Sequence, residues 1–342
     1  MILRVFISFI LFSTISCAQQ KVSNIPVSEK YKDITADNFV ERMLKEVERF
    51  DKESRYFIRP VQNNCVYEIL VNDVRTYKDY NLDVIATPVS VNHAILKSGP
   101  QTITVRMYPV GDLLKDNYDI GDTVTTLLDN TSMKIEVVKY DAYNLSHRLD
   151  DEEIVFTHYS PTQEGTKKFV GSGLPYYEYT FSFNAEVPYN IEGWQNSQDL
   201  TKFDKEELEN EVKKYYTQVK QIYLKEDIDA LAKISFGDYL VIAKSKYYKK
   251  QEIEDMLSSL KEKVEYKEKD FGDLQDKKLS FYGGGKIVVL RHSSIEPIDK
   301  RLRGKSAFWF KCLKGDRIKG VFPAVDLHLP QGDSLDQLRM ID

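Results

Sequence analysis

Asp326 and His328 stand two positions apart in an apolar run near the end of this 342-residue chain. Alternate side chains of a β-strand point to one face, so this spacing predicts a carboxylate beside an imidazole. A carboxylate that orients an imidazole suits general-base catalysis. The same spacing also fits a partly exposed pair at a strand end. Asp326 and His328 are therefore a candidate pocket of a hydrolase-like enzyme, set against a purely structural interpretation.

Other spacings that carry chemistry are absent from the sequence. The five histidines form no HExxH motif, and no G-x-S-x-G elbow is present. Gly283-Gly284-Gly285-Lys286 lacks the other positions of a phosphate loop and predicts a hairpin turn. The acids between Asp112 and Asp122 lack EF-hand spacing and indicate a solvated loop. We predict no catalytic residue outside the candidate pocket, no metal site and no cofactor.

Aromatic side chains supply the second kind of candidate site. The chain has 22 Tyr and 17 Phe but only 2 Trp, and Trp194 has Tyr176 and Tyr189 near it in sequence. These three residues form either an exposed platform that binds a glycan or a protein, or, for Trp194, a buried hinge between domains. The basic run from Arg301 to Lys305 is interpreted as a solubilising loop.

The first eighteen residues have the three parts of a secretory signal. Arg4 supplies a positive charge, Val5–Phe12 forms a short apolar core, and Ser13–Ala18 is mostly small residues. A bilayer-spanning helix needs roughly 20 apolar residues, so this run is too short to be one. Residues 1–18 therefore predict a signal peptide and an exported protein.

The end of this leader allows two kinds of processing. Ser16-Cys17-Ala18 has the small residues that a general signal peptidase reads, which would free Gln19. Alternatively, Thr14-Ile15-Ser16-Cys17 resembles the lipobox of bacterial lipoproteins, with Thr14 where that family usually has Leu. This resemblance, which we favour, implies a lipid on Cys17 and attachment to a membrane. The protein is then either an outer-membrane lipoprotein or periplasmic.

Charge and cysteine content narrow the partners. The net charge is −5, and the lysines after residue 201 are interleaved with acids, as on a solvated helix surface. Nucleic acid is therefore not expected as a partner. Cys65 and Cys312 could pair in an oxidising compartment, but each lies in an apolar strand-like run, where a buried free thiol is the favoured interpretation.

Hydrophobic periodicity divides the rest of the chain. Residues 19–59 are a tether with a helix over 37–52, which should dock on the segment after it. Residues 60–190 alternate with period two, most clearly from Tyr177 to Val187, and predict an antiparallel all-β sandwich. Residues 191–203 form a linker.

Residues 204–342 predict an α+β domain. Helices begin at Asp204, near Asp227 (a shorter one) and before Ile253, and two hairpins come after them. The joint from Tyr223 to Leu231 resembles the first helix-to-helix joint of NTF2-like domains. That resemblance implies one curved sheet wrapped by helices around a pocket.

These observations favour one function over two alternatives. Export, a sandwich and many aromatic residues favour a non-catalytic envelope module that binds a protein or a glycan. One alternative is an immunity-type protein that occludes a toxin in the periplasm. The other is a hydrolase-like enzyme that uses a pocket in the C-terminal domain.

Overall fold

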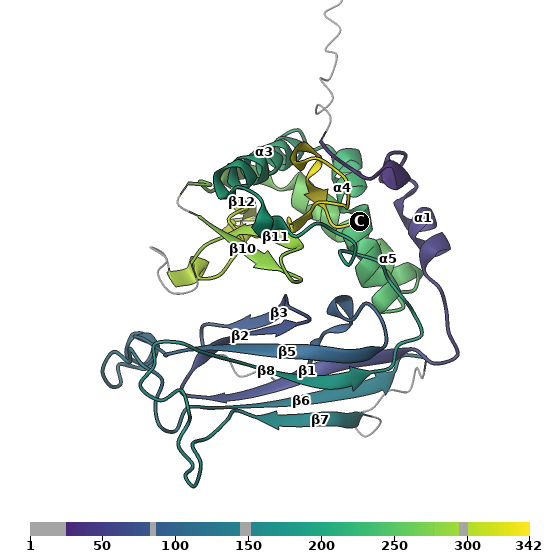
Figure 1. The fold of residues 1–342 in the computed structure, drawn as a ribbon. Coiled ribbons are helices and arrows are strands. Elements are labelled where there is room, and N and C mark those ends of the chain that lie inside the picture. Colours follow the sequence, from purple (N-terminus) through teal and green to yellow (C-terminus); the bar gives the residue numbers. More distant parts are fainter. Residues whose placement is uncertain (1–24, 83–86, 144–151, 276, 294–299) are drawn as a thin grey trace, which may run out of the picture.

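We describe a computed structural model of the chain over residues 25–82, 87–143, 152–275, 277–293 and 300–342. Within these residues the fold consists of four antiparallel sheets and five α-helices (Figure 1). The predicted signal peptide, its cleavage sites and Cys17 lie outside the described residues. No helix of the described part has the length and apolar character needed to cross a membrane.

Two four-stranded sheets form the lower half of the molecule in Figure 1. Their orders are β4-β1-β6-β7 and β3-β2-β5-β8. The strands are β1 (Ser54–Asn63), β2 (Val66–Val71), β3 (Val74–Asp79), β4 (Val89–Ser90), β5 (Gly99–Tyr108), β6 (Ser132–Asp141), β7 (Glu153–Tyr159) and β8 (Tyr177–Ala185). All pairings among them are antiparallel, as the alternating pattern predicts.

The two sheets face each other across one apolar core. Ile58 and Ile135 from one sheet pack in the same buried cluster as Val105 and Phe183 from the other. In β8 the residues at the N-terminal half are partly exposed, and burial alternates strictly from Phe181 onward. The period-two pattern therefore marks the inward side of each strand, as expected for sheets with one wet face.

The upper half combines three long helices with two small sheets. The helices are α3 (Lys205–Leu224), α4 (Ile228–Ser245) and α5 (Lys250–Glu265). The sheets have the orders β13-β12-β9 and β10-β11-β14-β15. Their strands are β9 (Lys267–Phe271), β10 (Lys278–Tyr282), β11 (Ile287–Arg291), β12 (Phe310–Lys314), β13 (Arg317–Val321), β14 (Leu327–His328) and β15 (Arg339–Met340). The chain also has a short exposed helix, α2 (Leu113–Tyr118), in a loop of the lower half.

Aspartates cap α3 and α4 where the sequence predicts. The Asp204 side chain accepts from the Glu207 amide at 2.9 Å, and the Asp227 side chain accepts from the Ala230 amide at 2.9 Å. The second helix is the shorter of the two, as predicted, because α3 has 20 residues and α4 has 18. Its central Ser235 and Gly237 weaken the helical signal, but both are buried, so tertiary packing maintains the helix.

The strands of the upper half do not form the single curved sheet that the NTF2-like resemblance implies. They divide into two separate sheets within the described residues. The resemblance is limited to the joint between α3 and α4, where Lys225 ends one helix and Asp227 caps the next.

The N-terminal helix is shorter than predicted and docks elsewhere. It runs as α1 (Phe39–Glu46), because Val47 is extended at φ −83° and ψ 111°. Phe39 and Met43 are buried in the core of the upper half, where Phe39 meets Phe236 at a ring distance of 5.3 Å. The prediction that this helix packs on the strands next to it in sequence was therefore wrong: it packs on α4 and α5.

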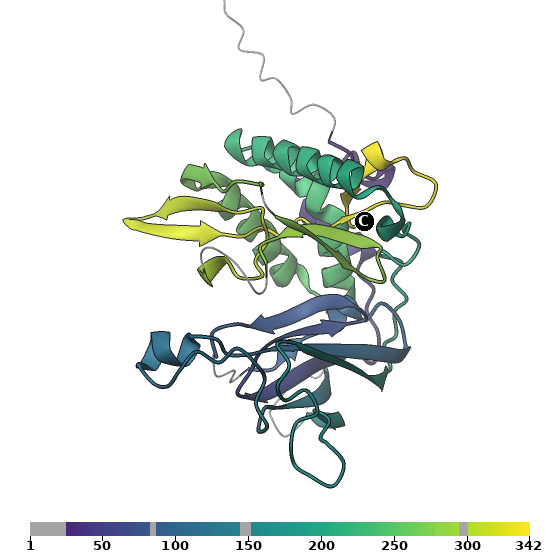
Figure 2. The same cartoon turned by 60° about the vertical axis from the view of Figure 1, so that its left-hand side comes forward.

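The two halves are joined by apolar and polar contacts. Trp194 packs in the lower core together with Tyr282 and Val289 of the β10–β11 hairpin. The amides of Gly283 and Gly284 donate to the backbone and side chain of Asp73 at 3.0 and 2.9 Å. The hairpin is therefore held over the turn between β2 and β3, and Figure 2 shows the sheets of the two halves in this arrangement.

Candidate functional site

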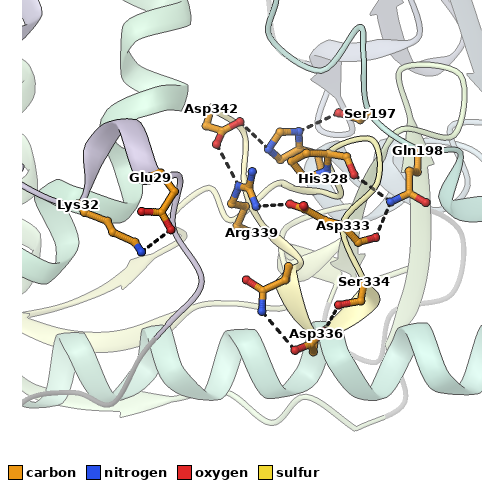
Figure 3. A network of polar contacts seen from close by, with 12 residues as sticks. Glu29, Lys32, Ser197, Gln198, His328, Asp333, Ser334, Asp336, Arg339 and Asp342 are labelled. Atoms are coloured by element: carbon orange, nitrogen blue, oxygen red, sulfur yellow. Dashed lines mark hydrogen bonds and ion pairs between the residues drawn. The ribbon is translucent and has the colours of Figure 1, made fainter.

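His328 is buried at the centre of a polar network that closes the C-terminal segment (Figure 3). Its Nδ1 lies 2.8 Å from Ser197 Oγ, and its Nε2 lies 3.1 Å from Asp342 Oδ1. Arg339 binds Asp342 at 3.0 Å and Asp333 at 2.7 Å. The predicted partner of His328 was wrong: Asp342 takes the place given to Asp326, because the chain turns back after β14 and pairs β15 beside it.

A hydroxyl, an imidazole and a carboxylate in series can serve acyl transfer when the hydroxyl faces the substrate. Here the hydroxyl end is the closed one, since Ser197 is 6% exposed and His328 2%. The carboxylate end is more open, because the Asp342 side chain is 17% exposed. Through the contact between its Nδ1 and Ser197, His328 ties the predicted linker 191–203 to the C-terminal segment.

Electrostatics keep this network charged. Burial by itself raises the pKa of Asp342, but contacts with His328 and Arg339 outweigh it and lower the pKa to about 2. Asp326 lies near another acid instead: burial and then the Asp326 charge raise the pKa of Asp238 to about 7. Asp326 and His328 therefore belong to different electrostatic environments.

We expect Asp342→Asn to reduce the free energy of unfolding at neutral pH by on the order of 2 kcal/mol. A lowered carboxyl pKa stabilises the fold above the unfolded value near 3.8 and ceases to do so as the pH falls through about 2. Urea unfolding between pH 2 and pH 7 should therefore give a flatter profile for the variant than for the native protein. Asp316→Asn, in an exposed turn, is the control. Parallel profiles for Asp342→Asn and the native protein would contradict this account.

The three aromatic candidates do not form one exposed platform. Trp194 is 7% exposed and Tyr189 8%, and Tyr189 Oη accepts from Asn92 at 3.1 Å. The platform prediction was therefore wrong for these two residues, and Trp194 packs where the halves meet. Tyr176 is 37% exposed, and its hydroxyl bonds Glu178 at 2.6 Å. Tyr176 alone of the three lines a surface hollow.

That hollow has a volume of about 460 Å³ and lies between β2, β5 and the β10–β11 hairpin. An adjoining hollow of about 410 Å³ lies between Tyr80, Tyr108 and the segment that contains Arg301 and Arg303. We call the two hollows with their surrounding cations the cationic cleft. Its cations are Arg75, Lys78, Arg106, Lys278, Arg291, Arg301 and Arg303, and its other members include Glu68, Tyr80, Tyr108, Tyr176 and Tyr282.

Strand register places the charges on the face of the sheet that looks toward the upper half. Lys78, Glu68, Arg106 and Glu178 are opposite one another on β3, β2, β5 and β8. Glu68, only 3% exposed, contacts Arg75 at 3.0 Å and Arg106 at 3.9 Å. Arg106 also bonds Glu178 at 2.6 Å. Each acid of this row therefore lies beside arginine, and the upper half adds further cations.

Tyrosine rings hold several of these cations in place. Arg303 lies over Tyr80 at 4.7 Å and over Tyr108 at 5.9 Å. Arg291 lies over Tyr282 at 5.4 Å. Cation–π contacts of this kind contribute about 0.5–2 kcal/mol each. The guanidinium positions are thus set by packing before any ligand arrives.

Burial and neighbouring positive charges act together on Lys78. Burial and then the charges of Arg75 and Arg291 lower the pKa of Lys78 to about 7. Its ammonium group donates to the Arg303 carbonyl at 2.7 Å, which fixes it at the junction of the two halves. Arg291 Nε is buried without a hydrogen-bond partner among the described residues.

Sequence reasoning did not identify this cleft. The sequence predicts a solubilising loop from Arg301 to Lys305, whereas Arg303 lies inside the cleft. Nothing in the sequence marks Arg75, Lys78 or Arg106 as residues of a binding site, because ordinary strand residues flank each of them.

Comparisons with known proteins give no further guidance: no family model, no curated protein and no solved structure matches the chain. The cysteines add no chemistry to the site. Cys65 and Cys312 are both free and buried, in the lower and upper cores respectively. No group of three or more potential metal ligands occurs in the described part of the chain.

Proposed function

We propose that this protein is an exported, non-catalytic binding module whose cationic cleft takes an anionic ligand. The observation that carries the proposal is the gathering of Arg75, Lys78, Arg106, Arg291 and Arg303 at one junction. Like charges brought together repel one another. Guanidinium and ammonium groups bind anions through charge-assisted hydrogen bonds, so a bound anion would offset part of that repulsion.

The way the cations are held favours binding over catalysis. Arg106 is fixed by its ion pair with Glu178, and Arg303 is fixed over the Tyr80 ring. Guanidinium groups held in this manner suit recognition of carboxylate, sulfate or phosphate groups, and they neither donate nor accept protons near neutral pH. Binding to a protein or a glycan that carries such acid groups is the function this arrangement supports best.

The remaining parts of the proposal come from the sequence. Residues 1–18 act as the signal peptide, and Cys17 carries a lipid that anchors the protein to a membrane. Residues 60–190 and 204–342 are two domains, an all-β sandwich and an α+β domain, with the cleft between them. The cleft would then face ligands of the cell envelope.

An array of glycans and proteins, probed with the purified protein, tests the binding proposal. We expect binding to acidic members and none to their neutral counterparts. Raising the salt from about 50 to 500 mM should weaken that binding, because charge interactions at exposed sites are screened. Binding that ignores both ligand charge and salt, or the absence of any acidic ligand, would contradict the proposal.

Mass spectrometry of the mature N-terminus tests the export proposal separately. The expected species begins at Cys17 and carries lipid. A species that begins at Gln19 would retain export but refute the lipid anchor. A chain that retains Met1 in the cell would refute export itself.

A further inference from the structure

A further hollow lies within the upper half and shares no lining residue with the cationic cleft. It has a volume of about 370 Å³ and lies between α3, the loop that follows β9 and the segment that leads into β12. Small-molecule sites are mostly apolar hollows of about 300–1,000 Å³ with a few convergent polar groups. The hollow therefore has the dimensions of a site for a small ring with a short side chain.

Aromatic side chains form the floor of this hollow. Tyr216 and Phe308 are buried and meet edge-on, with ring centroids 5.7 Å apart. Phe271, which is partly buried, packs on Phe308 at 5.6 Å. Burial of an apolar ring on such a floor is favourable, and tilted or edge-on aromatic contacts add to it. The floor therefore favours a ligand that has an aromatic ring.

Trp309 forms one wall, and its contacts hold it in position. A Cβ atom at Gly272 would lie 2.7 Å from Trp309 Cε2, so glycine is the residue that lets the indole ring approach the backbone this closely. The Gly272 amide donates to the Trp309 carbonyl at 3.0 Å, and the indole stacks on Phe322 with ring centroids 5.4 Å apart. This wall is therefore in place without a ligand.

The lining also contains one charge of each sign. Lys220 lies one helical turn after Tyr216 on α3, and its Nζ lies 5.3 Å over the Phe271 ring. Asp273 lies two residues after Phe271, and its Oδ1 accepts from the Gln275 amide at 2.8 Å. Neither charged residue forms an ion pair within the described part of the chain. A ligand with both an ammonium and a carboxylate group matches this lining better than a simple anion or cation.

We propose that this hollow binds a free aromatic amino acid. The ring lies on the aromatic floor beside Trp309, the carboxylate binds Lys220, and the ammonium group binds Asp273. This site goes beyond the proposed binding of acidic ligands in the cationic cleft and does not depend on it.

Titration with L-phenylalanine, followed by tryptophan fluorescence and by calorimetry, tests the inference. Trp309 lines the hollow, whereas Trp194, the other of the two tryptophans, is buried where the halves meet. We expect the emission to change on binding in the native protein and to stay constant in Trp309→Phe. L-alanine, which lacks the ring, should bind at least about tenfold more weakly than L-phenylalanine.

Two analogues and two variants test the charges separately. Phenylpropionate lacks the ammonium group, and phenethylamine lacks the carboxylate. Lys220→Gln should weaken L-phenylalanine and phenylpropionate at least about threefold without weakening phenethylamine, since partly exposed charge pairs contribute modestly. Asp273→Asn should weaken L-phenylalanine and phenethylamine without weakening phenylpropionate. Lys213→Gln is the control, because Lys213 lies on the same helix outside the hollow and pairs with Glu209 at 2.7 Å.

Each other outcome counts against the site. An emission change that persists in Trp309→Phe would place the ligand elsewhere, and equal affinities for L-phenylalanine and L-alanine would refute the aromatic floor. Equal effects of Lys220→Gln and Lys213→Gln would refute the position of the carboxylate. If no ring-bearing compound binds below about 10 mM, the inference fails while the cationic cleft is unaffected. Thermal melts of each variant confirm that lost affinity does not reflect unfolding.

Discussion

Replacing Asn92 by leucine is expected to reduce the free energy of unfolding by about 4 kcal/mol, a large effect for a single polar residue. The Asn92 side chain is fully buried. It accepts from the Tyr56 amide at 2.6 Å and donates to the carbonyls of Ser54 and Ser245 at 3.0 Å each. Removing it leaves these buried groups without partners, at about 1–3 kcal/mol per group.

The position of Asn92 explains why so large an effect is expected. Ser54 begins β1 of the lower half, and Ser245 ends α4 of the upper half. Asn92 therefore connects the two halves at a second place, apart from the β10–β11 hairpin. Urea unfolding measures the effect, with Asn196→Leu as the control, since Asn196 is exposed and its side chain bonds Glu192 at 2.9 Å. A loss below about 1 kcal/mol for Asn92→Leu would contradict this account.

The second large effect concerns affinity. We expect the double variant Arg106→Gln/Arg291→Gln to bind an acidic ligand from the array at least about a hundredfold more weakly than the native protein. Each guanidinium contributes one charge-assisted hydrogen bond of about 1.5–3 kcal/mol, and 1.4 kcal/mol corresponds to tenfold. Calorimetry at low salt measures the change.

A change of opposite sign in the same hollow is the matched control. Glu178→Gln removes a negative charge that now binds Arg106 at 2.6 Å, without changing side-chain size. It is expected to strengthen the binding of an anion several-fold, because Arg106 is then released from its partner. If both substitutions weaken binding equally, packing rather than charge governs the site.

The helices and strands of this fold were predictable where the type of a side chain depends on residues close to it in the sequence. The alternation from Phe181 to Ala185 reflects one buried face, and Asp204 and Asp227 satisfy amides three residues later in the chain. Such signals are local and survive in the sequence. Within helix α4, burial rather than propensity maintains Gly237, which is not a local signal.

The sites were not predictable, because their partners are far apart in the chain. His328 bonds Ser197, 131 positions away, and Lys78 bonds the Arg303 carbonyl, 225 positions away. Residues this far apart in the chain form no local motif, so one sequence alone does not indicate that they are in contact. Trp194 differs from these residues: it stands among polar residues in sequence, and its burial against the β10–β11 hairpin agrees with its interpretation as a buried hinge.

The central claim is that the cations of the cleft are held together against their mutual repulsion and that an anion relieves it. Lys78 reports on this directly, because burial and the neighbouring Arg75 and Arg291 lower its pKa to about 7. An anion bound nearby should raise that pKa toward the ordinary value of about 10.4, so that binding at pH 8 takes up protons. Affinity should accordingly fall as the pH rises above about 7.

Proton uptake on binding of an acidic ligand from the array at pH 8, obtained by calorimetry in buffers of different ionisation heat, tests this claim. The expected result is uptake of most of one proton by the native protein and of almost none by Lys78→Met. Binding without proton uptake, or equal uptake by the two proteins, would contradict the claim.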